Sequence, residues 1–256
     1  MHPSKLASLS FDNVTRHVTR HVRLFDFRRK LPAHTASNYV QKCMDANISH
    51  IHVSPHSNVS WMHDSNKYKD TSLVCSVSDV YELMGGVPDG CNTLMFSVNI
   101  TPTTTHEDLQ DQFQRIGSML SVMYGMGHRS FSLIGSVNAI DAVTSEKHML
   151  QLLQQTVSVC NFFNQYLIKQ VSLFLPSTCT LQIVKHVATH VKDVQVGVWI
   201  DKTHSLSDLS FIMACHPHHL VSEVNDTLIH NLHKLHYTSG VHVDKLAELE
   251  RLIGQR

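Results

Sequence analysis

The chain has 256 residues, of which 42% are hydrophobic and 16% are charged, and its 21 Lys and Arg residues balance 21 Asp and Glu residues. This length and composition fit one folded domain with a sizeable core and exclude a largely disordered chain. The formal net charge of zero gives no overall electrostatic footprint for nucleic acid or for an anionic membrane surface.

Cysteine and histidine usage bounds the chemistry further. The six cysteines contain no C-x-x-C pair and lie mostly in apolar segments, which indicates reduced, buried thiols. The 21 histidines are dispersed through every predicted element, a distribution that favours compositional bias over metal binding. No apolar run is long enough for a membrane span. Four basic residues and one acid within residues 1–23 are loosely similar to a mitochondrial transit segment.

Short β-like apolar runs alternate with longer helical ones, which predicts βα units around a parallel sheet. Eight strands are expected, at residues 21–27, 50–54, 72–76, 93–99, 130–137, 170–175, 195–200 and 219–224. Eight strands suit a closed barrel, but an open doubly wound sheet has the same periodicity.

Helices are expected between these strands, at residues 35–46, 105–125, 145–166, 180–191 and 205–215. Thr105 followed by two acids is typical of a helix N-terminus, and Gly125 and Gly127 mark the end of the same helix. No internal repeat or low-complexity linker is present. We therefore expect an N-terminal extension over residues 1–20 and one domain over residues 21–256.

Six segments resemble, in order, the hydroxymethylglutaryl-CoA (HMG-CoA) lyase family of DRE-TIM metallolyases. Residues 228–246 are similar to that family's closing helix, Thr-Gly-Val turn and helix, and residues 53–64 are similar to its Val-Ser-Pro loop. The resemblance decides between the two sheets: it implies a single-domain α/β TIM (β/α)8 barrel, with the site at the carboxyl ends of the strands.

The resemblance also aligns the family's site residues with this chain. Arg28 falls on the arginine that polarises the substrate carbonyl, and Arg29 replaces the aspartate that binds a divalent cation. A guanidinium offers no lone pair to a cation and repels it. His52 stands at a family glutamate.

The remaining positions of the aligned site differ as well. Leu175 replaces an aspartate, and Val198 and Ile200, followed by Asp201, replace the metal-binding His-x-His-Asp run. Residues 224–227 run directly into the closing helix, so the glycine-rich loop with the family's reactive cysteine is predicted to be deleted. Hydrophobic side chains supply no ligand atoms, and the alignment therefore predicts a lost metal site, no cofactor and no catalysis.

The leading hypothesis is an inactive relative of HMG-CoA lyase that serves as a structural subunit of a larger mitochondrial assembly, such as a respiratory complex or mitoribosome. Its contacts with other chains would involve residues 1–20 and the uncharged stretches 119–126 and 162–167. One alternative is an acyl-CoA lyase or aldolase with a rebuilt, metal-free site around Arg28, His52 and Asp201. A third is a CoA-binding module without chemistry.

Two other groups of residues each allow two interpretations. Arg28, Arg29 and Lys30 form a basic cluster that could contact a phosphate of a nucleotide, CoA or RNA, or could form replacement salt bridges. Trp61 and Met62 suit either an interface or packing over the barrel end.

Three histidine groups could bind a metal. His17 with His21 and His186 with His190 have the i, i+4 spacing of a helical metal pair, but neither has the Glu of H-E-x-x-H, and a structural or solvent-facing role is favoured. Residues 216–219 hold three histidines in a predicted loop, where a surface metal site is conceivable.

Overall fold

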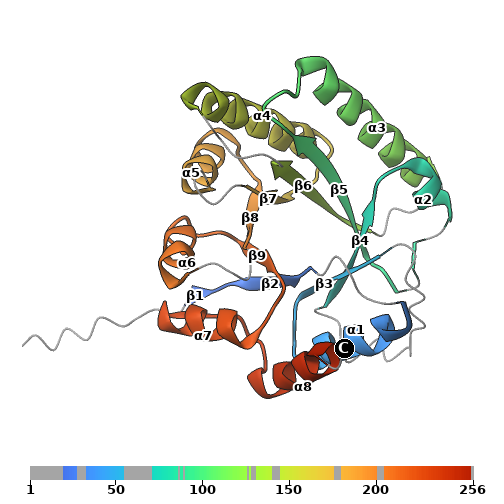
Figure 1. The fold of residues 1–256 in the computed structure, drawn as a ribbon. Coiled ribbons are helices and arrows are strands. Elements are labelled where there is room, and N and C mark those ends of the chain that lie inside the picture. Colours follow the sequence, from blue (N-terminus) through green and yellow to red (C-terminus); the bar gives the residue numbers. More distant parts are fainter. Residues whose placement is uncertain are drawn as a thin grey trace, which may run out of the picture.

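The computed structural model describes residues 20–27, 33–54, 71–85, 87–88, 90–125, 127, 131–139, 145–175, 180–200 and 205–254. Eight parallel strands form a closed barrel in chain order, and helices pack around its outside (Figure 1). The predicted (β/α)8 barrel is therefore confirmed, and the open sheet is excluded. None of the helices in these ranges is long and apolar enough to cross a membrane.

The barrel strands lie where the apolar runs predicted them. They are β2 (Arg23–Asp26), β3 (His50–Val53), β4 (Ser72–Val77), β5 (Thr93–Ile100), β6 (Ser132–Ala139), β7 (Gln170–Phe174), β8 (Gln195–Trp199) and β9 (His219–Ser222). Each pairs in parallel with the next, and β2 closes the barrel by pairing with β9 in the register Arg23 to His219. Near-continuous apolar sequence is what strands covered on both faces require.

The helices are α1 (Ala33–Asp45), α2 (Val80–Gly85), α3 (His106–Gly125), α4 (Glu146–Gln165), α5 (Thr180–His190), α6 (Leu206–Met213), α7 (Asp226–Lys234) and α8 (Val243–Gly254). Their first turns are capped as the sequence indicated. The hydroxyl of Thr105 accepts from the Asp108 N–H at 3.1 Å, and Ser145 and Ser205 cap α4 and α6. All five predicted helices are confirmed.

Two short strands were not predicted. β1 (Arg20–His21) pairs in parallel with β10 (Tyr237–Thr238) and so joins the start of the described chain to a segment near its end. Backbone hydrogen bonds from Val22 to Thr238 and from Arg20 to His236 extend this pairing.

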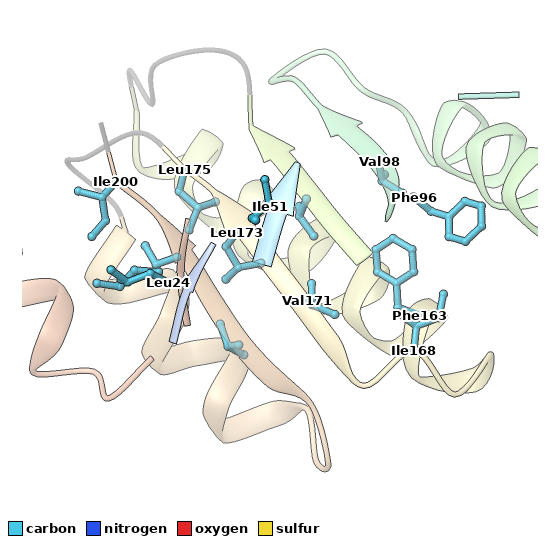
Figure 2. Close-up of a cluster of buried hydrophobic side chains, with 14 of the residues drawn as sticks. Leu24, Ile51, Phe96, Val98, Phe163, Ile168, Val171, Leu173, Leu175 and Ile200 are labelled. Carbon is cyan, nitrogen blue, oxygen red and sulfur yellow. The ribbon is translucent and has the colours of Figure 1, made fainter. Parts of the chain in front are cut away.

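Alternation along the strands divides the core into two layers. The larger layer lies between strands and helices, and Figure 2 shows part of it, including Leu24, Leu173 and Phe163 of α4. The smaller layer fills the barrel lumen and consists of Phe25, Val74, Met95, Ile134 and Val221, with Phe27 and Trp199 packed against it. Side chains of the same parity as these face the lumen.

Candidate functional site

The carboxyl end of the lumen carries polar side chains on four consecutive strands. Nε2 of His52 on β3 lies 2.8 Å from Oγ of Ser76 on β4. The amide of Asn138 on β6 donates to Oδ1 of Asn99 on β5 at 3.1 Å, and Ser136 donates to Asn138 at 2.9 Å. His52, Ser76 and Asn138 are half-buried and Asn99 is exposed, so this polar half of the mouth is open to a ligand.

The position of Asn99 is fixed from outside the barrel. The side chain of Gln112 on α3 accepts from the Asn99 backbone N–H at 2.9 Å and donates to the Asn99 carbonyl at 3.0 Å. This two-point contact holds the end of β5, and with it the Asn99–Asn138 pair, in a defined place.

The opposite half of the mouth is aromatic. Trp199 on β8 contacts Phe27 after β2 and Phe174 on β7, with ring centroids 4.4 and 5.4 Å apart. Phe27 also packs on the imidazole of His52 at 4.0 Å and so joins the two halves. The indole Nε1 of Trp199 is buried and has no hydrogen-bond partner among the described residues. The mouth therefore offers an apolar wall that faces an imidazole and two amides.

The described part of this mouth does not fit a divalent cation. Its donors are one imidazole with neutral amides and hydroxyls, and no three His, Cys, Asp or Glu side chains come together anywhere in the described ranges. The nearby carboxylate of Asp26 faces away from the lumen and accepts from the Val224 N–H at 2.8 Å. An imidazole beside a hydroxyl and an amide pair can instead accept a proton and stabilise a developing oxyanion.

The amino end of the lumen contains two further histidines, and these are closed off from solvent. His219 on β9 hydrogen-bonds Ser172 on β7 at 2.9 Å, and its ring is stacked with that of His50 at 6.5 Å. Burial lowers the pKa of His219 to about 3 and that of His50 to about 4, with smaller contributions from neighbouring positive groups. The ring of His219 lies against the position that a Cβ at Gly197 would take, so a larger residue there would have to displace the ring. Both imidazoles are neutral packing elements.

Comparison with protein-family models and with curated protein sequences gives no match. Solved structures do match over nearly the whole chain. HMG-CoA lyase from Brucella melitensis has a TM-score of 0.69 at 10% identity and covers 92% of this chain and 98% of its own. The enzyme from Pseudomonas aeruginosa gives 0.70 at 11% identity, with 93% of each chain covered. The fold is that of the HMG-CoA lyases.

Two further solved structures share this HMG-CoA lyase-like fold. An HMG-CoA lyase from Acinetobacter baumannii, in complex with coenzyme A and 3-methylmalate, has a TM-score of 0.64 at 13% identity, with 92% of each chain covered. The carboxyl transferase domain of Rhizobium etli pyruvate carboxylase gives 0.62 at 6% identity, over 93% of this chain and 47% of that one. The prediction that the chain is not an enzyme is contradicted, because these neighbours come from enzyme families.

The positions on which that prediction rested are also misplaced. Leu175, Val198 and Ile200 all belong to the layer between strands and helices (Leu175 and Ile200 are labelled in Figure 2). On β8 the residues facing the lumen are Gly197 and Trp199, so the aligned His-x-His positions are shifted by one residue onto the outer face. Hydrophobic residues at 198 and 200 are therefore core residues and say nothing about a metal site.

Among the aligned site residues that the structure describes, His52 alone lies in the mouth. Arg28, Arg29, Lys30 and Asp201 lie outside the described residues, as do Trp61 and Met62. The connection before the closing helix is short, as expected: β9 ends at Ser222 and α7 begins at Asp226, with Asn225 as its N-cap.

The histidine groups separate into different environments. Of residues 216–219, His219 enters the lumen, whereas His216 contacts Arg20 and Tyr237 on the outside. They therefore form no common site. His17 is outside the described residues, and His186 and His190 on α5 are brought together, with ring centroids 4.0 Å apart.

Sequence reasoning missed most of the mouth. Asn99 and Asn138 lie at or near the ends of neighbouring strands, and polar residues there were a signal that could have been used. Trp199 aligns with the middle position of the family's His-x-His run, where the family pattern specifies no residue. Ser76 and Phe174 carried no distinguishing pattern.

Proposed function

We propose that the protein is a carbon–carbon lyase or aldolase that acts on an acyl-CoA thioester at the carboxyl end of its barrel. The observation that carries this proposal is the pairing of His52 with Ser76 in the lumen, opposite an aromatic wall and beside the Asn99–Asn138 amides. The likeness to HMG-CoA lyases, one of them in complex with coenzyme A, supports the substrate class.

The proposed reaction is cleavage of a 3-hydroxyacyl thioester. His52 takes the proton of the 3-hydroxyl group, and the oxygen lone pair forms a carbonyl as the bond between C2 and C3 breaks. The bonding electrons pass to the thioester enolate, whose oxygen accepts hydrogen bonds from the amides of Asn99 and Asn138. The proton held by His52 then reaches C2 of the enolate. Ser76 holds the imidazole in place during both transfers.

The other residues of the mouth suit the rest of such a substrate. Phe27, Phe174 and Trp199 form a wall for the acyl chain. Arg28, Arg29 and Lys30 follow Phe27 directly in the sequence, and their charge suits the phosphates of CoA.

The test is turnover of HMG-CoA and related 3-hydroxyacyl-CoA thioesters by the purified protein, with product thioester and carbonyl compound measured by mass spectrometry. His52→Gln should lower kcat by about 10²–10⁴-fold, the usual contribution of an acid–base group. His230→Gln, at an exposed position on α7, is the control. Full turnover by His52→Gln would refute the assignment. Stabilisation by CoA with no product from any thioester would favour a binding module instead.

We propose, as a second function, that the barrel is a subunit of a larger assembly that contacts it through the groove between α3 and α4. This groove has a volume of about 880 Å³ and no charged residue lines it. Phe113, Phe162 and Tyr166 form its aromatic part, with stacked rings 4.2 Å apart for the first two, and Gln114 and Asn161 stand beside them. A neutral surface of this kind loses little solvation when a protein partner covers it.

An exposed apolar residue follows the last groove residue in the sequence. Leu167 follows Tyr166 with a φ of 61° and 76% exposure, a left-handed conformation that costs a leucine energy in the isolated chain. We propose a mitochondrial assembly, because of the basic N-terminal composition. Blue-native electrophoresis of tagged protein from isolated mitochondria tests both points: Gln114→Glu with Asn161→Glu should release it from a large complex, whereas a free monomer in the wild type would refute the role.

A further inference from the structure

Two histidines stand together on the last turn of α5, away from the lumen. His186 and His190 are four residues apart and so share one face of the helix. Their ring centroids are 4.0 Å apart with planes at 30°. Metal ions bind imidazole nitrogen at about 2.0–2.1 Å. After small side-chain rotations, a single ion can therefore be bound by both rings.

One of the two rings is already oriented as a ligand. Nδ1 of His190 lies 2.8 Å from the backbone carbonyl oxygen of His186. A carbonyl only accepts, so Nδ1 carries the hydrogen and Nε2 carries the lone pair. Histidines that bind metals usually donate their other ring N–H to a carbonyl or carboxylate in this way, which fixes both tautomer and ring direction.

The surroundings of the pair admit a cation. His190 is exposed and His186 is half-buried, so solvent reaches the pair. The carbonyl groups at the C-terminal end of a helix carry partial negative charge, which favours a positive ion beside the last turn. Lys185 and Lys192 are exposed, and their flexible side chains can turn away from a bound ion. Since no third His, Cys, Asp or Glu of the described ranges joins the pair, water would complete the coordination.

We propose that His186 and His190 form a two-histidine surface site for a divalent transition-metal ion such as Zn²⁺, Cu²⁺ or Ni²⁺. Imidazole pairs select these ions over Mg²⁺ and Ca²⁺, which prefer oxygen ligands. Because helices of the barrel run opposite to the strands, the end of α5 lies at the amino side of the barrel, opposite the mouth. The site is therefore independent of the proposed lyase chemistry, and its open coordination positions can accept a side chain from a partner.

The experiment uses the full chain, stripped with a chelator and titrated with Cu²⁺ and Ni²⁺ by calorimetry, with electron paramagnetic resonance of the Cu²⁺ form. One equivalent should bind more tightly than the rest, with two nitrogen ligands. His186→Asn and His190→Asn should each weaken it by more than about tenfold, the loss that follows removal of even an outer partner of a ligand. His230→Asn is the matched control, an exposed histidine on α7.

The outcomes separate cleanly. Equal binding by the wild type and both single variants would overturn the proposal, as would a first equivalent lost in His230→Asn instead. Circular dichroism checks that each variant is folded, which we expect because His190 and His230 are exposed and His186 is only half-buried. Neither substitution should change lyase turnover, so failure of the metal site and failure of the proposed function are distinguishable.

Discussion

The two ends of the barrel lumen contain the same residue type in opposite roles. His50 and His52 lie on one strand, two positions apart and on the same face. His50 is buried beside Phe25 and His219, and its pKa is lowered to about 4. His52 is half-buried, touches Ser76 and Phe27, and faces the open end. Depth along the lumen, and not residue type, separates a packing histidine from one available for chemistry.

The largest expected effect comes from the closed end. Gly197→Ala places a Cβ that clashes with the ring of His219, which Ser172 and the surrounding barrel hold in place. We expect a loss of about 3 kcal/mol in the free energy of unfolding, measured by urea denaturation, as for overpacking of a rigid core. Gly125→Ala is the control, because nothing lies within 4 Å of its added Cβ.

A second substitution sharpens this prediction. If the ring of His219 is the obstacle, Gly197→Ala combined with His219→Ser should recover part of the lost stability. A double variant less stable than the sum of the two single variants would contradict the proposed overlap.

Acid should distinguish the two ends next. The folded pKa values of His50 and His219, about 4 and about 3, are lower than the unfolded value of 6.5, so the unfolded chain binds protons first as pH falls. The contribution of these two neutral imidazoles to the free energy of unfolding is complete above pH 6.5. It is lost as pH falls from 6.5 toward 4. The loss is about 1.4 kcal/mol per pH unit for each histidine.

His50→Phe tests this directly, because Phe25 already packs against the position. Urea denaturation at pH 7.5, 6.0 and 5.0 should show a shallower loss of stability in this variant than in the wild type. His230→Phe on α7 should keep the wild-type slope. An unchanged slope in His50→Phe would mean that the buried imidazole does not titrate as proposed.

The smallest expected change in stability lies at the open end. Ser76→Ala removes the hydrogen bond to His52 and should cost about 1 kcal/mol or less in unfolding free energy. If Ser76 positions the imidazole, kcat for the proposed lyase reaction should fall about tenfold, while KM stays within about twofold. Ser76→Thr, which keeps the hydroxyl, should restore turnover. A rise in KM with kcat unchanged would instead place Ser76 in contact with the substrate.

The number and positions of the barrel strands could be predicted because each is an apolar run between segments of helical periodicity, whereas the closed barrel order came from the family resemblance. Because the strands are mostly apolar along their length, the sequence did not show which of their residues face the lumen and which face the helices. Val196, Val198 and Ile200 alternate with Gly197 and Trp199, so both faces of β8 read as apolar and the alignment could slip by one residue.

Other features depend on pairing that no local pattern encodes. β1 and β10 have two residues each, and their register comes from contacts across most of the chain. The Asn99–Asn138 pair exists because two neighbouring strands share a register, which only the closed barrel sets.

The pairing of β2 with β9 has a consequence for synthesis. Arg23 pairs in register with His219, which is synthesised much later. The partner of β1, β10, is synthesised later still. At a ribosome that adds about 5–20 residues per second, roughly 10–40 s pass between the emergence of β2 and that of its second neighbour. During that time one edge of β2 has no partner and exposes its backbone groups. The nascent chain is therefore most vulnerable to aggregation at its beginning, and a chaperone that binds early would act on this strand.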